Sequence, residues 1–204
     1  MSAIGLYLEL NAGCILILLI VLINMSGTVS IQTEQKLFAG VLISNIAFFS
    51  LDLVWMLIDC GIFPASRTIN QLVNAFYFWA GGVAGMLWLL YATYRMQPER
   101  LRHRKWLIGA SLPLAALTLL IFSSIWTNWI FEIDEFNGYH RGPFYLLHPI
   151  LGYGYLVWAG VQALLCGLRE NHYVRRSDNF TLALFGVFPM IGGIIQTLFR
   201  TPAL

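Results

Sequence analysis

Long apolar runs separated by short polar loops make up almost the whole chain. A helix needs about 20 apolar residues to cross the hydrocarbon core of a bilayer, and the sequence contains six such runs. They cover residues 4–25, 37–62, 69–94, 106–126, 144–168 and 180–199. The longest gap between them, 127–143, has 17 residues, which leaves no room for a soluble domain. The pattern predicts an all-α membrane protein, a six-transmembrane-helix bundle in which residues 1–204 form a single domain.

The composition supports a membrane protein. Only 11% of the residues are Asp, Glu, Lys or Arg, whereas 58% are hydrophobic, and a water-soluble surface needs far more charge. The net charge of +2 is too small to indicate a nucleic-acid partner, so the expected partner is the lipid bilayer. The first run contains Glu9 and Asn11 and lacks a basic start, so we expect it to remain as a helix and not to be cleaved as a signal peptide.

The distribution of lysine and arginine predicts the orientation, because these residues accumulate on the cytoplasmic side of short loops. With the N-terminus outside, nine of the twelve fall inside, namely Lys36, Arg95, Arg100, Arg102, Arg104, Lys105, Arg169, Arg175 and Arg176. The other three, Arg67, Arg141 and Arg200, fall outside. Six crossings then place both termini and the gap 127–143 outside the cell.

That gap carries a turn signal. Asn137-Gly138 lies between residues of high strand propensity, and Asn-Gly favours a two-residue hairpin turn because both positions accept a positive φ. We therefore predict a short extracytoplasmic β-hairpin between Trp129 and Phe144, with its turn at Asn137-Gly138. An alternative is that the segment is only a rigid connector whose aromatic residues lie in the membrane interface.

The segment FEIDEFNGYHRGPFYLL at 131–147 resembles a loop found in bacterial membrane sensor regions, the N-terminal multi-helix regions that precede GGDEF diguanylate cyclase or histidine kinase domains. SLDLVWMLIDC at 50–60, NAFYFWAGGVAGMLWLLYATY at 74–94 and PMIGGIIQ at 189–196 extend the resemblance over most of the chain. The recurring loop positions are occupied by Asp134, Asn137, Tyr139, His140, Arg141, Gly142 and Pro143. The resemblance implies a sensory module in the bacterial plasma membrane, and a homodimer in a full-length parent.

Such sensor regions usually carry one further helix and then a catalytic domain, and neither is present in these 204 residues. The chain is therefore expected to be a truncated protein, a gene fragment or a stand-alone relative, and not itself an enzyme. No HExxH or GxSxG signature accompanies His140 and His148, and the three cysteines have no metal-ligand spacing. We expect neither a metal nor a cofactor.

Polar residues within the spans predict a pocket, because ionisable groups in a bilayer normally face the bundle interior or a wet cavity. Asn45, Asp52 and Asp59 are seven residues apart, which keeps them on one helix face. The residues expected to line a small-molecule pocket open to the outside are Asp52, Trp55, Asp59, Asn70, Asn74, His148 and Gln196. We expect His140 and Arg141 at its mouth, with Arg141 able to pair with Asp59 and close it.

Three functions agree with this pattern. The first is a sensory or receptor module that reads the outer pocket. The second is a transporter subunit, because about 200 residues and six helices also describe the substrate-binding components of vitamin-uptake systems, although the first helix lacks an Ala-xxx-Ala pattern for docking a partner. The third is a structural scaffold, in which the polar residues only form hydrogen bonds between helices. The reading frame beyond codon 204 would discriminate between them.

Overall fold

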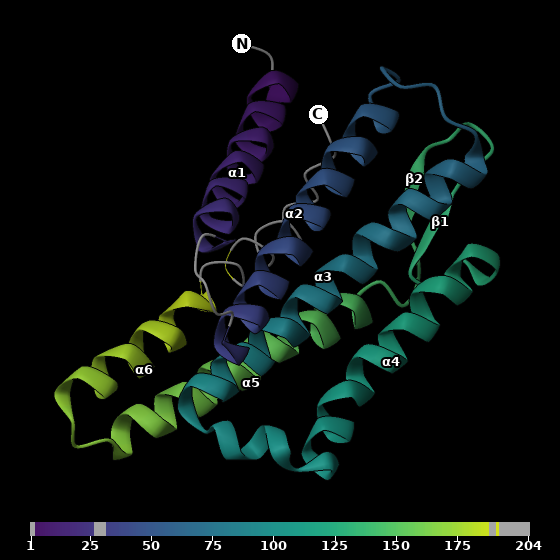
Figure 1. Ribbon diagram of the computed structural model, residues 1–204. Helices are drawn as coiled ribbons and strands as arrows, with labels where there is room; N and C mark the ends of the chain where they lie inside the picture. Colours follow the sequence, from purple (N-terminus) through teal and green to yellow (C-terminus); the bar gives the residue numbers. More distant parts are fainter. Residues whose placement is uncertain (1–2, 27–31, 188–190, 192–204) are drawn as a thin grey trace.

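The computed structural model describes residues 3–26, 32–187 and 191, and this part of the chain is almost entirely helical (Figure 1). Its α-helices are α1 (Ala3–Ser26), α2 (Thr33–Asp59), α3 (Arg67–Met96), α4 (Arg104–Thr127), α5 (Leu147–Arg169) and α6 (Tyr173–Phe185), and a short 3₁₀ helix, η1 (Pro98–Arg102), precedes α4. Helices α1 to α5 are long and apolar enough to cross a membrane. The fold is therefore that of an α-helical bundle consistent with a multi-pass membrane protein.

Five of the six predicted spans correspond to these helices to within a few residues. The sixth, 180–199, falls largely outside the described residues, so the six-span count stays a prediction. Helix α6 begins at Tyr173, seven residues before that predicted span. Its first turns carry Arg175, Arg176 and Asp178, which are exposed. The apolar pattern predicts only which part of a helix can enter lipid. The helix itself can begin earlier, because polar residues also form its backbone hydrogen bonds.

Helix α3 lies at the centre of the bundle and packs against α2, α4 and α5, while α1 packs on α2 and α6 packs on α5 (Figure 1). Glycine allows the closest of these crossings. A Cβ atom at Gly85 would lie 2.9 Å from the carbonyl oxygen of Gly152, so α3 and α5 approach at backbone distance. Nearby, Gly82 faces the side chains of Leu114 and Leu117 on α4.

Helix α2 ends three residues earlier than its apolar run. Gly61 has φ of 69°, a left-handed conformation that glycine adopts without steric cost. The amides of Ile62 and Phe63 then both donate to the carbonyl of Leu57 at 3.0 Å, which closes the last turn. Asp59 is consequently the last residue of α2, at the end of the bundle that also carries the hairpin.

The predicted hairpin is confirmed. Strand β1 (Phe131–Ile133) pairs antiparallel with β2 (Tyr139–Arg141), with Phe131 opposite Arg141. Side chains alternate along β1, so Phe131 and Ile133 are buried and Glu132 points outward. Together with Ile130 they join residues of α3 and α4 in a hydrophobic core at this end of the bundle. The hairpin is therefore part of the core and not an appended loop.

The predicted position of the turn is wrong. The loop consists of residues 135–137, because the amide of Asp134 donates to the carbonyl of Gly138 at 3.0 Å and the amide of Asn137 donates to that of Asp134 at 3.2 Å. Only Asn137 of the Asn-Gly pair has a positive φ, 69°. Oδ1 of Asp134 accepts hydrogen bonds from the amides of Phe136 and Gly138, at 2.8 and 2.7 Å. These bonds favour the three-residue loop, a β-turn followed by one left-handed residue.

The hairpin end of the bundle comprises residues 60–66 and 128–146, and the basic end comprises residues 33–36, 95–105 and 169–178. Figure 1 shows them at opposite ends of the helices.

Candidate functional site

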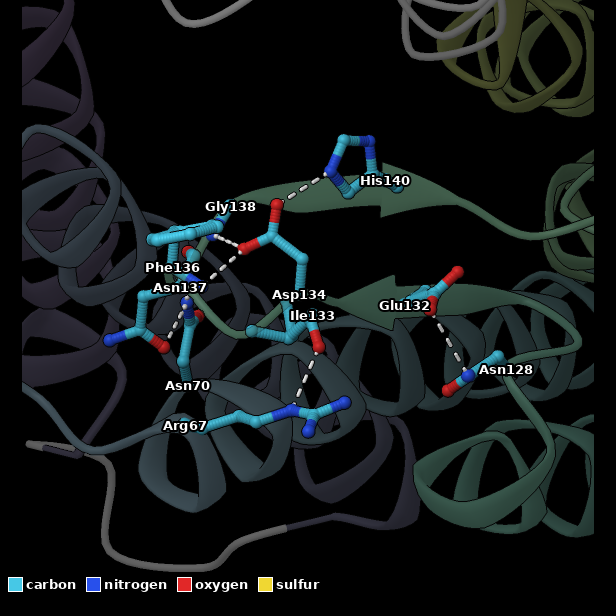
Figure 2. A network of polar contacts seen from close by, with 10 residues as sticks. All are labelled: Arg67, Asn70, Asn128, Glu132, Ile133, Asp134, Phe136, Asn137, Gly138 and His140. Atoms are coloured by element: carbon cyan, nitrogen blue, oxygen red, sulfur yellow. Dashed lines mark hydrogen bonds and ion pairs between the residues drawn. The ribbon is translucent and has the colours of Figure 1, made fainter.

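A chain of asparagine side chains joins the hairpin to the interior of α3, and Figure 2 shows its contact between Asn70 and Asn137. Nδ2 of Asn74 donates to Oδ1 of Asn70 at 2.8 Å, and Nδ2 of Asn70 donates to the carbonyl of Asn137 at 3.1 Å. Nδ2 of Asn137 then donates to the carbonyl of Ala65 at 2.6 Å. Asn70 and Asn74 are both fully buried. The hairpin loop is thus connected to the first turns of α3 and to the segment that precedes it.

A second contact holds the base of this loop. Nε of Arg67, in the first turn of α3, donates to the carbonyl of Ile133 at 2.9 Å (Figure 2). Burial of polar groups is favourable only when they are hydrogen-bonded. The network therefore gives the hairpin one defined position on α3.

The outer face of the hairpin carries an acid–histidine pair. Nε2 of His140 lies 2.9 Å from Oδ2 of Asp134 across the end of the strands (Figure 2). The hydrogen bond from His140, followed by that from the amide of Gly138, holds the pKa of the Asp134 carboxyl below its usual range. The pair is exposed to solvent, so it orders the hairpin loop without burying charge.

Replacing Asp134 with asparagine should destabilise the chain in a pH-dependent way. The amide keeps an oxygen for the loop but removes the charge, and a carboxyl with a lowered pKa contributes stability above its unfolded pKa of about 3.9 that is lost as the pH falls through the folded value. The melting temperature of the variant should therefore lie below that of the parent at pH 5 to 7 and meet it in stronger acid. Thermal unfolding in detergent from strong acid to pH 7 measures the difference in melting temperature. Glu132→Gln is the control. A gap that persists unchanged in acid would contradict this account.

A pocket of about 510 Å³ opens at the hairpin end. Its walls come from the last turn of α2, from the α2–α3 connection and from the hairpin loop. The lining residues are Ile58, Asp59, Gly61, Phe63, Pro64, Ala65, Ser66, Phe136, Asn137 and Gly138. Asn137 belongs both to this lining and to the asparagine chain, so the pocket wall is bonded directly to α3.

Asp52 lies deeper, between helices. The hydroxyl of Tyr7 on α1 donates a hydrogen bond to its Oδ2. Asn11 on α1 and Tyr77 on α3 lie close to the same carboxyl, which is buried. The ring of Trp55 stacks on Tyr77, with ring centroids 5.8 Å apart. This group of polar and aromatic residues connects α1, α2 and α3 in the interior of the bundle.

His148 lies under the hairpin, where its ring meets that of Phe78 with centroids 4.6 Å apart. The guanidinium of Arg141 lies over the ring of Tyr145, 4.6 Å from its centroid. Among the described residues, the ion pairs do not include one between Arg141 and Asp59, so closure of the pocket by that pair stays a prediction.

The structure distributes the predicted pocket residues over several places. Asp59 lines the pocket, Asn70 and Asn74 form the chain behind it, Asp52 and Trp55 lie between the helices, and Gln196 lies outside the described residues. Of the loop motif, Asn137 reaches the pocket, while Tyr139 packs against Trp55. Gly142 and Pro143 follow β2, and within the described ranges no three His, Cys, Asp or Glu side chains are grouped so that they could hold a metal ion.

Sequence reasoning missed several contributing residues. Tyr7 was not singled out, although Tyr7 and Asn11 are four residues apart and therefore share a face of the first helix. Arg67 was placed outside the membrane without a partner. Phe63 and Phe136 carried no recognisable signal, because an aromatic residue in a loop is equally compatible with contact to lipid.

Comparison with known protein families, with curated proteins and with solved structures finds no match to this chain.

Proposed function

We propose that the chain is a membrane-embedded sensory or receptor module of the bacterial plasma membrane, which detects a signal at the hairpin end and passes it to an output domain outside these 204 residues. The loop motif supports this role through its resemblance to sensor regions of diguanylate cyclases and histidine kinases. The accumulation of Lys and Arg at the basic end supports an orientation with the hairpin outside and the output inside.

The observation that carries the proposal is that α3 is bonded at both ends to other elements. At the hairpin end Asn70 binds Asn137 of the pocket wall. At the basic end Arg95 lies 3.4 Å from Glu34 on α2 and 3.6 Å from Asp178 on α6. The 25 residues between Asn70 and Arg95 correspond to about 38 Å of helix. One continuous helix thus connects the pocket to α6.

These contacts have strengths suited to a switch. The asparagine chain is buried and geometrically defined, whereas the ion pairs of Arg95 are half exposed, and exposed pairs contribute little stability, on the order of 0 to 1 kcal/mol each. Two arrangements at the basic end can therefore differ by a small free energy. A ligand at the hairpin end shifts their populations by its difference in affinity for the two arrangements.

The proposal predicts that Asn70→Ala changes signal output. Residues 1–204 would be joined through one further helix to a diguanylate cyclase domain, and cyclic di-GMP would be measured in cells. Loss of the bond from Asn70 to Asn137 separates the pocket wall from α3, so the output should change several-fold, on the order of the 5- to 150-fold range of allosteric couplings. Asn45→Ala is the matched control, because the amide of Asn45 donates to Val41 within its own helix.

Melting temperature and membrane content would be measured for each variant. If output follows these two quantities for Asn70→Ala and Asn45→Ala alike, the asparagine chain only stabilises the fold and the sensory proposal fails. Accumulation of a solute inside vesicles that contain the chain and a transport ATPase would instead establish the transporter alternative.

A further inference from the structure

We propose that the pocket at the hairpin end binds a small organic cation of the ammonium class. This proposal rests on the proposed function and deepens it by naming the chemistry of the signal.

The charge of the pocket lining is negative. Asp59 is an acid, and among the described lining residues none is basic. Asp59 is also the last residue of α2, so the pocket lies at the negative end of that helix's dipole. Both features favour a positively charged ligand.

A second carboxylate, that of Asp134, lies beside the wall but is not part of the lining. A Cβ atom on Gly138 would lie 2.8 Å from Oδ2 of Asp134. Of the nearby basic residues, His140 contacts Oδ2 of Asp134, and Nε of Arg67 donates to the carbonyl of Ile133. Among the described residues, the pocket lining therefore carries one acid, Asp59, and no basic side chain.

Two aromatic rings border the same space. Phe136, at the tip of the hairpin, is 95% exposed, and Phe63 is 54% exposed. An aromatic side chain that is almost fully exposed contributes little to folding, whereas its ring face attracts a cation. A carboxylate combined with aromatic rings favours an alkylammonium group over a metal ion, because a hard metal ion requires several oxygen ligands and gains little from hydrocarbon. A volume of about 510 Å³ admits such a group together with an apolar substituent.

The test uses the full 204-residue chain in phosphatidylglycerol nanodiscs. Choline and benzyltrimethylammonium are the cationic probes, and 3,3-dimethylbutan-1-ol is the uncharged analogue of choline. Titration calorimetry and thermal unfolding should show saturable binding of both cations and none of the alcohol. Sodium and magnesium chloride at equal ionic strength should not raise the melting temperature in the same way.

Variants assign the binding to the pocket. Asp59→Asn should weaken binding at least about tenfold, and Phe136→Ala about fivefold, as expected for loss of a partly desolvated charge contact and of a ring contact. Glu135→Gln, an acid of the same loop outside the pocket lining, and Phe144→Ala, an aromatic residue that is 48% exposed, are the matched controls and should bind as the parent does.

The ammonium group has two possible sources, a free solute or a lipid headgroup. Repeating the titration in nanodiscs that contain phosphatidylcholine or phosphatidylethanolamine separates them. A weaker apparent affinity for choline in those discs assigns the site to a headgroup, and an unchanged affinity assigns it to a solute; either result supports an ammonium site.

The proposal is overturned if neither cation binds saturably, if the alcohol binds as well as choline, or if Asp59→Asn binds as the parent does. Its failure is distinguishable from failure of the sensory role. Binding that leaves cyclic di-GMP output of the chimera unchanged would reject the sensory role and keep the cation site. If the output responds to Asn70→Ala but no cation binds, the cation site is rejected and the sensory role is kept.

Discussion

Replacing Gly142 with alanine should cost the chain about 3 kcal/mol of unfolding free energy, at the upper end of the usual cost of overpacking. A Cβ atom there would lie 2.3 Å from the carbonyl oxygen of Trp129 and 2.5 Å from that of Asn128. Both neighbours are backbone, so no side chain can rotate away. The amide of Gly142 donates to the carbonyl of Ile130 at 2.9 Å, and this bond at the base of the hairpin would be lost as well.

Denaturant unfolding in mixed micelles measures the free energy, and limited proteolysis between residues 129 and 144 reports whether the hairpin has opened. Gly154→Ala is the control, because a Cβ atom at Gly154 would meet nothing within 4 Å. Equal stability of the two variants would mean that the base of the hairpin can widen without cost, contrary to the packing described here.

Tyr155→Phe should cost about 2 kcal/mol, since it leaves buried backbone groups without their partner. Tyr155 is fully buried, and its hydroxyl donates to the carbonyl of Ala110 at 2.8 Å and accepts from the amide of Leu114 at 2.7 Å. These two groups flank Pro113, which disturbs the hydrogen bonding of α4. The hydroxyl of Tyr155 on α5 thus completes the backbone hydrogen bonding of the neighbouring helix α4.

The matched control is Tyr153→Phe on the same helix, which removes a hydroxyl two residues away. Unfolding free energies of both variants, measured in the same micelles, decide the point. If Tyr155→Phe and Tyr153→Phe are equally stable, the backbone of α4 closes its own hydrogen bond when the hydroxyl is absent.

The positions of helices α1 to α5 follow from the sequence alone. Transfer into lipid depends on the apolar content of about 20 consecutive residues, and a segment in lipid must satisfy its own backbone hydrogen bonds, so neighbouring segments hardly affect the prediction. Helix ends follow from local conformation instead. The left-handed Gly61 ends α2 at Asp59, although the apolar pattern continues to residue 62.

The hairpin was predictable from strand propensity and the Asn-Gly pair, but its loop was not. The carboxylate of Asp134 bonds two loop amides and selects a three-residue loop, and the depth at which Phe131 and Ile133 are buried depends on α3 and α4. Alternation along the strand determines which side chains share a face, whereas the element that covers that face lies far away in the sequence.

In the candidate site too, the sequence predicts some features and only the tertiary structure decides others. Helical periodicity predicts that Asp52 and Asn74 face the interior of the bundle, because an ionisable or amide group is costly to expose to lipid, and both are buried. It does not identify their partners, Tyr7 on α1 and Asn70 on α3. The partner of Asp52 depends on which helix lies beside α2 and at what height. Polarity along the chain therefore determines which residues face inward, and only the packing of the helices decides which of them meet.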